Sequence, residues 1–166
     1  EDLYVRGPAL ERLFQRPATE LLANKVILDS VDGEYPVFYI EEGGEVTGLA
    51  VQAAGHGGYS GDIIMMIGFD VPARELLGVE IVAHSETPGV GANVEKGPFR
   101  RQWEGLTAGQ PVALRSSGGT IDAISGATFS SRAMVEGTNQ VIGLLRERTD
   151  EIMARIAERE ASGGAR

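Results

Sequence analysis

Most residues from Asp122 to Ser131 are small or hydroxylated, and they lead directly into a long helical pattern. The first N–H groups of a helix lack intrahelical partners, and the helix dipole adds positive potential at the same end. An anion such as a phosphate is therefore favoured beside Thr128. The small residues Gly126 and Ala127 would let that anion approach the backbone closely. The spacing predicts a phosphate site at the start of the last helix.

The same run also has a simpler interpretation. Ser130 or Ser131 can cap the helix through its hydroxyl, and this structural role needs no ligand. Asp122 can be an ordinary turn residue, while Ile124 and Phe129 can belong to the core. A hydroxyl cluster before a helix is most often a cap, so the motif has to be weighed with the rest of the chain.

The run from Asp122 through Ser125, Gly126 and Ala127 to Thr128 matches the flavin-attachment motif of the FMN-binding domain family. Two other segments are similar to family segments in order and spacing, namely Gly58 to Ile63, and His84 to Asn93 followed by Lys96. Within the family, the chain most resembles the G subunit of the Rnf ion-translocating electron-transport complex. It is also similar to the C subunit of the sodium-pumping NADH:quinone oxidoreductase. This context favours flavin attachment over a bare cap.

The resemblance implies that a flavin transferase joins FMN covalently, through its phosphate, to the hydroxyl of Thr128. An unactivated hydroxyl would not attack a phosphoryl group unaided, so Thr128 is expected to be a modification site and not a catalytic nucleophile. The transferase would recognise Asp122. The other residues expected at the cofactor are Ser125, Gly126, Ala127, Ser130, Ser131, Glu86, Thr87, Gly89, Val90, Lys96, Tyr59 and Ser60.

The second family-like segment supplies groups that suit an isoalloxazine ring. Glu86 and Thr87 are expected to hydrogen-bond the ring edge together with the backbone around Gly89, while Val90 packs on its face. Lys96 would influence the reduced flavin or the phosphate. Relatives often have leucine where this chain has Val90, which predicts a modest change in packing. A tight turn at Thr87 to Gly89 is the alternative, and it is compatible with ligand contact.

Three further residues have two interpretations each. Tyr59 and Ser60 reach the same pocket or lie at a hairpin tip. Trp103 flanks the ring or belongs to the core, which is the more frequent place for a lone tryptophan.

The resemblance implies an electron-transfer subunit of a membrane-bound ferredoxin:NAD oxidoreductase, with no complete enzymatic cycle of its own. The expected partners are the other integral subunits, especially the flavin-bearing D subunit, and the flavin transferase during maturation. Relatives carry one N-terminal membrane helix, so we expect the sequence to begin after such an anchor. The domain would then lie on the periplasmic or outer face of the inner (cytoplasmic) membrane.

Two other functions share parts of this pattern. An FMN-binding sensor or assembly module without redox turnover would have every motif described above. A serine hydrolase could use Ser60 and His84 with an acid such as Asp62. However, the residues around Ser60 lack the full nucleophile-elbow pattern, which makes the hydrolase the weaker alternative.

Composition excludes several classes of protein. The chain has 166 residues, of which 42% are hydrophobic, so one domain with a proper core is expected. A net charge of −9 without a basic stripe argues against a nucleic-acid partner. The absence of cysteine excludes disulfides and iron–sulfur ligation. His56 and His84 lack ligand-like spacing to each other, so no metal site is expected.

Hydrophobic periodicity predicts the elements of the first half. Residues 8–23 have helical spacing that Pro17 interrupts. Short strands are expected at 26–28, 37–40 and 46–53, separated by turns at Asp32-Gly33 and Gly43-Gly44. Residues 63–69 and 76–83 are apolar and β-branched enough for central strands.

The second half predicts a short helix at 98–103, an edge strand at 112–114, and a final helix from about Ser131 to Glu158. In that helix, Gly137 and Gly143 mark close packing or are merely tolerated. The fold class is therefore α+β, an antiparallel sheet core with an N-terminal helix and a long C-terminal helix. We expect a lead-in at 1–24, an FMN-binding domain at 25–158 and a flexible tail at 159–166.

Overall fold

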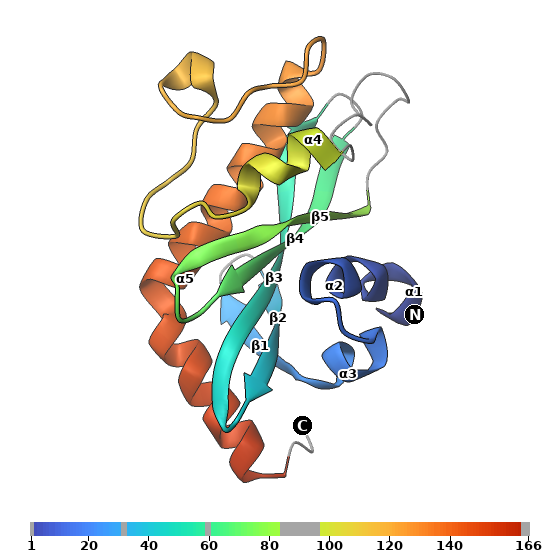
Figure 1. The fold of residues 1–166 in the computed structure, drawn as a ribbon, viewed down its shortest axis with the longest axis vertical. Coiled ribbons are helices and arrows are strands. Elements are labelled where there is room, and N and C mark those ends of the chain that lie inside the picture. Colours follow the sequence, from blue (N-terminus) through green and yellow to red (C-terminus); the bar gives the residue numbers. More distant parts are fainter. Residues whose placement is uncertain (1, 31–32, 59–60, 84–96, 164–166) are drawn as a thin grey trace.

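The computed structural model describes residues 2–30, 33–58, 61–83 and 97–163. Its main elements form an antiparallel sheet with helices on both sides (Figure 1). They are α1 (Asp2–Val5), α2 (Gly7–Phe14), α3 (Ala18–Ala23), β1 (Lys25–Ser30), β2 (Gly33–Glu42), β3 (Glu45–Gly58), β4 (Gly61–Asp70), β5 (Glu75–Ala83), α4 (Gly97–Arg100) and α5 (Thr128–Ala161). Short 3-10 helices follow α4 as η2 (Arg101–Trp103) and precede α5 as η3 (Arg115–Ser117). The predicted α+β class is confirmed.

The five strands of the sheet follow one another in space in the order of the sequence, and each is antiparallel to the next. All five predicted strands are present, and each includes the residues predicted for it. The prediction of a central position was wrong for β5, which lies at an edge of this sheet. A backbone segment covers the start of that edge, because Leu76 N–H donates to Leu106 O at 2.7 Å and Gly105 N–H donates to Leu76 O at 2.9 Å.

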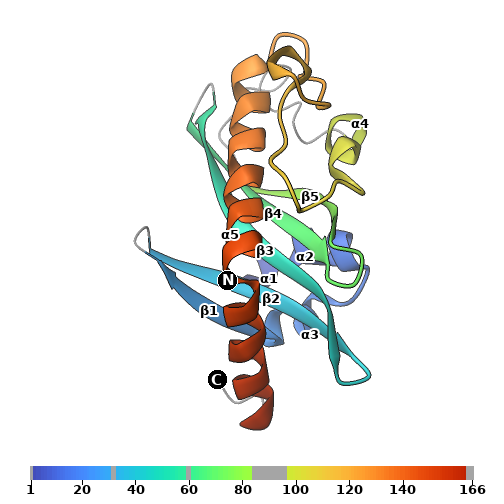
Figure 2. The same ribbon diagram turned by 90° about the vertical axis from the view of Figure 1, so that its left-hand side faces the viewer.

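The β1 and β2 hairpin diverges from the end of the β3 and β4 hairpin (Figure 2). Pro36 pairs with Ile27 of β1, whereas the pairing of β2 with β3 begins only at Val37. Tyr39 N–H donates to Asn24 O, on the β1 side of β2. Backbone N–H groups of successive strand residues point to opposite sides, so the nitrogen of Pro36 faces β3. Proline has no N–H to donate there, which ends the ladder. β3 and β4 therefore continue toward the start of α5 without β2, and β5 stays paired with β4 as far as Ile64.

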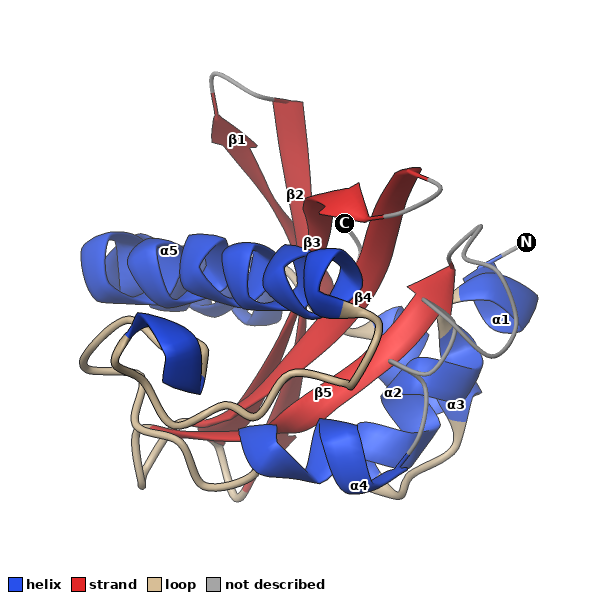
Figure 3. Cartoon of the chain, turned by 90° about the horizontal axis from the view of Figure 1, so that it is seen from above, coloured by secondary structure: helices blue, strands red, loops and turns tan. Residues whose placement is uncertain are grey.

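The sheet lies between α5 and the N-terminal helices (Figure 3). The larger core cluster joins α5 to one face of the sheet through Leu49, Val51, Ile67, Met134 and Val141, among others. The smaller cluster packs α2 and α3 on the other face through Leu10, Leu21, Phe38, Ala50 and Met66. Alternation of side chains along the strands therefore supplies two apolar faces.

Proline divides the N-terminal helical segment as predicted. α2 ends at Phe14, and α3 begins at Ala18 with Pro17 in the N-cap position. The short helix predicted at 98–103 is present as α4 and η2. The predicted edge strand at 112–114 is absent from the described residues, where only an isolated bridge joins Leu114 to Ile121. None of the described helices is both long enough and apolar enough to cross a bilayer.

α5 begins three residues earlier than predicted and continues to Ala161, so the first three residues of the expected tail are helical. Its 34 residues span about 50 Å at 1.5 Å per residue. It approaches β3 closely, because a Cβ on Gly55 would lie 2.0 Å from the carbonyl oxygen of Ala133. A Cβ on Gly137 would lie 2.8 Å from Cε of Met65, whereas one on Gly143 would meet nothing within 4 Å. Gly137 therefore marks close packing, and Gly143 is tolerated.

The far end of α5 is anchored to the sheet through Tyr39. Arg159 Nη1 donates to the Tyr39 hydroxyl at 2.5 Å, and that hydroxyl donates to Oε1 of Glu160 at 2.5 Å. Burial raises the pKa of Tyr39, and the hydrogen bond to Glu160 adds to this effect. Arg159 also donates to the carbonyl of Ala23, which links α5 to the end of α3.

Candidate functional site

A tight turn precedes α5 and determines where the helix begins. Ala127 N–H donates to Ile124 O at 2.9 Å, so residues 124–127 close a β-turn. Gly126, the third residue of this turn, has φ of +78°, the conformation that a type II turn requires at that position. Ser125 is exposed at the second position, and Ala127 is buried. The segment predicted as a phosphate loop thus contains a β-turn with glycine at its third position, and we call residues 122–127 the acceptor loop.

Thr128 is the first residue of α5, and its side chain is exposed. The N-cap residue is Ala127, whose methyl side chain makes no cap hydrogen bond to the first turn. The positive end of the helix dipole therefore lies beside an exposed hydroxyl.

The alternative interpretation, in which Ser130 or Ser131 caps the helix, is wrong. The helix begins before them, and both lie buried within its first turns. Ser131 instead joins the helix to the acceptor loop, because its hydroxyl accepts from Ile124 N–H at 3.0 Å and donates to Ala127 O at 2.8 Å. This hydroxyl fixes the turn against the helix.

Gln102 holds the other end of the acceptor loop. Its Oε1 accepts from the backbone N–H of Asp122 at 2.6 Å, and its Nε2 donates to the carbonyls of Asp122 at 3.0 Å and Phe99 at 3.2 Å. One amide side chain thereby joins the turn of α4 and η2 to the start of the loop. No local signal in the sequence points to this role, because Gln102 and Asp122 are 20 residues apart.

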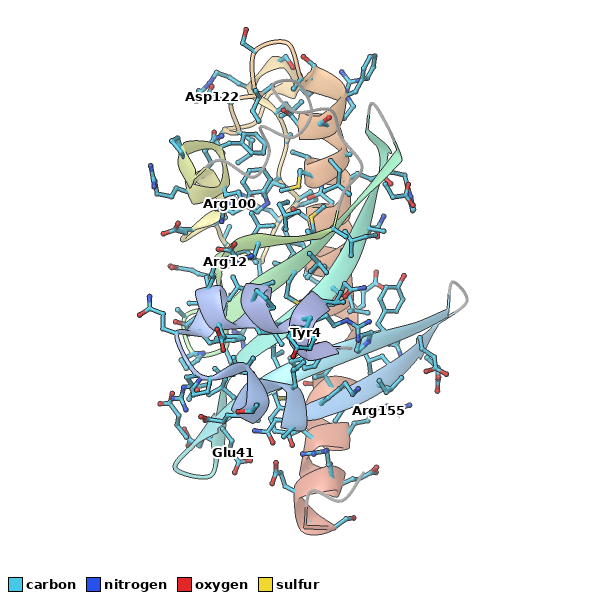
Figure 4. All side chains as sticks on the ribbon, turned by 90° about the vertical axis from the view of Figure 1, so that its right-hand side faces the viewer. Tyr4, Arg12, Glu41, Arg100, Asp122 and Arg155 are labelled. Atoms are coloured by element: carbon cyan, nitrogen blue, oxygen red, sulfur yellow. The ribbon has the colours of Figure 1, made fainter. Side chains whose placement is uncertain are left out.

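The Asp122 carboxylate forms a two-pronged pair with Arg115. Nε of Arg115 donates to Oδ1 at 2.6 Å, and Nη2 donates to Oδ2 at 3.3 Å. The hydrogen bond from Arg115 lowers the pKa of Asp122. Each side chain is 65% exposed, so the pair contributes little to stability. Figure 4 shows Asp122 at the same end of the molecule as the start of α5, with Glu41 and Arg155 toward the other end.

Two polar contacts, one half-buried and one buried, hold the segment before the acceptor loop against α5. Asn139 accepts from Val112 N–H at 2.8 Å and donates to Val112 O at 2.9 Å. Trp103 Nε1 donates to the Thr138 hydroxyl at 2.7 Å, and the indole ring is completely buried. Of the two interpretations of Trp103, the structure therefore confirms the core and not the ring-flanking position.

The end of β3 and the start of β4 lie at the same end of the molecule (Figure 1). Nδ1 of His56 lies 2.9 Å from Oδ1 of Asp62. This hydrogen bond raises the pKa of His56, and the charges of Asp62 and, more weakly, Glu136 of α5 act in the same direction. His56 and Asp62 are thus a hydrogen-bonded pair in the field of Glu136, which lies in the third turn of α5.

A family comparison matches residues 58–143 to the FMN-binding domain. The chain belongs to the FMN-binding domain family. The predicted resemblance is confirmed by curated relatives that are named as the G subunit of an ion-translocating oxidoreductase complex. The one from Pseudomonas aeruginosa strain UCBPP-PA14 is 32% identical over 139 residues, covering 80% of this chain and 63% of the relative. The one from Haemophilus influenzae strain Rd is 33% identical over 114 residues, covering 65% and 55%. The chain thus spans less than two thirds of these relatives.

Solved structures show the same fold. NqrC of Shewanella oneidensis superposes with a TM-score of 0.61 at 19% identity, covering 79% of this chain and 70% of that one. The C subunit of the Na(+)-translocating NADH-quinone reductase of Parabacteroides distasonis gives a TM-score of 0.55 at 24% identity, covering 69% and 62%.

The geometry of this FMN-binding domain suits a phosphate ester at Thr128. The hydroxyl is on an exposed side chain at the positive end of a 34-residue helix. Among the described residues, a Cβ built on Gly126 would meet nothing within 4 Å. The predicted residues Asp122, Ser125, Gly126, Ala127, Thr128, Ser130 and Ser131 form one continuous turn and helix start.

The remaining predicted site residues lie outside the described residues. They are Tyr59, Ser60, Glu86, Thr87, Gly89, Val90 and Lys96, together with His84 of the hydrolase alternative. Sequence reasoning missed Gln102 and Arg115, which hold Asp122. Within the described residues, no group of three or more His, Cys, Asp or Glu side chains is arranged to bind a metal ion.

A hollow of about 470 Å³ lies at the opposite end of the strands. It is lined by Leu13, Phe14, Arg16, Ile40, Glu42, Thr47, Gly48, Asp70, Pro72, Ala73 and Leu77. These residues belong to the end of α2 and to the strand ends at the β2–β3 and β4–β5 turns, whereas the acceptor loop lies at the β3–β4 end. The hollow is separate from the phosphate-compatible surface.

Proposed function

We propose that the protein is an electron-transfer subunit of an Rnf-like, ion-translocating ferredoxin:NAD oxidoreductase, and that it carries FMN as a phosphodiester on Thr128. The observation that supports this most directly is the exposed Thr128 hydroxyl at the start of α5, presented by a glycine turn in a chain of the FMN-binding domain family. Bound FMN supplies reversible uptake and release of electrons.

The attachment needs an external enzyme and an activated donor. The bond formed joins Oγ of Thr128 to the flavin phosphorus, and the bond broken is the pyrophosphate bond of a flavin dinucleotide donor. The nucleoside monophosphate leaves, and the hydroxyl proton passes to a base of the flavin transferase. Thr128 is thus the acceptor of the flavin phosphate, and the role of this chain is to position the Thr128 hydroxyl.

The chain's own residues hold that acceptor in place. Gln102 and Ser131 fix the two ends of the acceptor loop, so the Thr128 hydroxyl is presented in one geometry. Asp122, exposed and held by Arg115, is the group on this surface that the transferase recognises. The dipole of α5 offsets the negative charge that the ester retains.

The proposed partners follow from the relatives, which are named as subunits of an ion-translocating complex. They are the other integral subunits, especially the flavin-bearing D subunit, and the flavin transferase during maturation. The domain would lie on the periplasmic or outer face of the cytoplasmic membrane. Covalent attachment suits that place, because a tethered cofactor is not lost by dilution.

Intact-mass measurement after co-expression with a flavin transferase tests the attachment. The expected result is a mass increase equal to FMN less one water, present in Thr120→Ala and absent in Thr128→Ala. Thr120 is a matched control because its side chain is exposed just before the same loop. An unmodified wild-type chain, or a Thr128→Ala chain that still gains the flavin mass, contradicts the proposal.

Electron transfer separates the carrier from a sensor or assembly module. The flavin-loaded protein is reduced anaerobically and mixed with another purified component of the complex, and its absorbance is followed. A carrier is expected to be reoxidised as the partner becomes reduced. Persistent reduction of the flavin would favour the sensor.

A further inference from the structure

Phe129, the residue after Thr128, presents a large apolar side chain to solvent. It is 52% exposed, and the other exposed large apolar residues in the described part of the chain are Tyr4, Val5 and Leu77. None of these three belongs to the acceptor loop or to α5. Single exposed apolar residues are common, so exposure alone assigns no role. The position of Phe129 beside the acceptor hydroxyl distinguishes it from the others.

The guanidinium of Arg132 lies over the Phe129 ring. The guanidinium carbon of Arg132 lies 5.8 Å from the ring centroid, within the range of a cation–π contact. Helical side chains lean toward the N-terminus, so Arg132 covers the turn that contains Thr128 and Phe129. It is also the only cationic residue between Thr128 and Glu136 in the sequence. The first turn of α5 therefore combines an aromatic face with a positive charge.

We propose that Phe129 and Arg132 form the surface of α5 on which the isoalloxazine ring of Thr128-linked FMN rests. This inference depends on the proposed function. A flat ring with apolar faces packs well against an aromatic side chain. The ester and the reduced ring are both negatively charged, and Arg132 offsets that charge. Because the ring is tethered at the neighbouring residue, its local concentration is high and a small contact area is enough.

Flavin fluorescence provides a direct test of this contact. The full chain is co-expressed with the transferase, and flavin loading is verified by intact mass. Tryptophan in contact with a flavin quenches its emission, so Phe129→Trp is expected to lose emission severalfold per bound flavin. Tyr4→Trp is the matched control, because Tyr4 is an 84% exposed aromatic residue on α1 and is expected to keep wild-type emission.

The charge is tested through the redox midpoint potential of the bound flavin. Arg132→Gln removes the cation that favours the reduced form, so its potential is expected to be lower than that of the wild type. Arg146→Gln is the control, since Arg146 is an exposed arginine about 20 Å further along the same helix. It is expected to leave the potential unchanged. Phe129→Ala should also make the flavin more accessible to iodide quenching.

The outcomes separate this inference from the proposed function. If all variants carry flavin but Phe129→Trp keeps wild-type emission and Arg132→Gln keeps the wild-type potential, the ring lies elsewhere and the inference is overturned. A role of Phe129 in docking another protein would give this same result. If no variant gains flavin mass at Thr128, the proposed function fails and the inference fails with it.

Discussion

The side chain of Gln102 and the backbone of Asp122 exchange two hydrogen bonds of opposite direction, at 2.6 Å and 3.0 Å. The side-chain amide of Gln102 thus bonds to Asp122 in the way that the backbone of a neighbouring strand would in a β-sheet. The start of the acceptor loop is thereby fixed to η2, whose Trp103 is buried in the core. The amide of Gln102 thus holds the start of the loop, while Ser131 holds its end.

Gln102→Ala is expected to slow flavin attachment while leaving the fold intact. The variant loses both bonds to Asp122, which lowers stability by about 1 kcal/mol because water replaces them at this exposed site. The loop then samples more conformations, so the transferase encounters the correct one less often. Rates of flavin attachment from intact mass and amide exchange of residues 120–125 measure the effect. Gln140→Ala, an exposed glutamine of α5, is the control; equal rates in the two variants would contradict this prediction.

Ser131→Ala is expected to destabilise the protein by about 1–2 kcal/mol, because the half-buried N–H of Ile124 loses its acceptor. Urea unfolding followed by circular dichroism measures this change. Ser116→Ala, at an exposed position in η3, is expected to change stability by less than about 0.5 kcal/mol. Equal effects of the two substitutions would show that the Ser131 hydroxyl does not hold the turn.

Two glycine substitutions are expected to act in opposite directions. Gly55→Ala places a Cβ 2.0 Å from the Ala133 carbonyl oxygen, so α5 has to move away from β3. We expect a loss of about 3 kcal/mol or more in unfolding free energy. Gly143→Ala meets nothing within 4 Å and gains helix propensity, which predicts a stabilisation of about 0.5–1 kcal/mol. Thermal unfolding of the two variants measures both signs, and a mild Gly55→Ala variant would contradict the described packing.

His56 is expected to titrate above its ordinary pKa of 6.5, because its hydrogen bond to Asp62 favours the charged form. A pKa raised by folding contributes stability that is complete below pH 6.5 and is lost as the pH rises through the folded value. The contribution is small, since the His56 and Asp62 side chains are 59% and 52% exposed. NMR titration of His56 measures the pKa. Asp62→Asn should return it toward 6.5, whereas Glu45→Gln, on the far turn, should not.

The sequence pattern predicted which helices and strands are present better than it predicted where α5 begins. The five strands follow from alternating apolar residues between turn signals, and the break at Pro17 follows from the missing N–H of proline. The start of α5 was misplaced because hydroxyl residues suggested a cap at Ser130 or Ser131. The actual boundary depends on the turn at Gly126 and on the contact of Ser131 with Ile124.

The acceptor segment was predicted from a local motif, whereas the residues that hold it were not. Gln102 contacts Asp122 across 20 residues, and Asn139 contacts Val112 across 27. Such pairs follow from the tertiary packing of loops on α5, and no periodicity or spacing in the sequence indicates them. The strand predicted at 112–114 was wrong for the same reason. The partners of this segment are the side-chain amide of Asn139 and a single bridge to Ile121, and neither can be recognised from the local sequence.

The anchor at Tyr39 has a mechanical consequence. Arg159 connects the last turns of α5 to the end of α3, about 45–50 Å along the helix from Thr128. A pull on the N-terminal helices is therefore carried by the sheet and by the far end of α5, while Gln102, Ser131 and Asn139 secure the opposite end. Tension applied to the N-terminal helices is thereby borne at the end of α5 that is remote from the acceptor threonine.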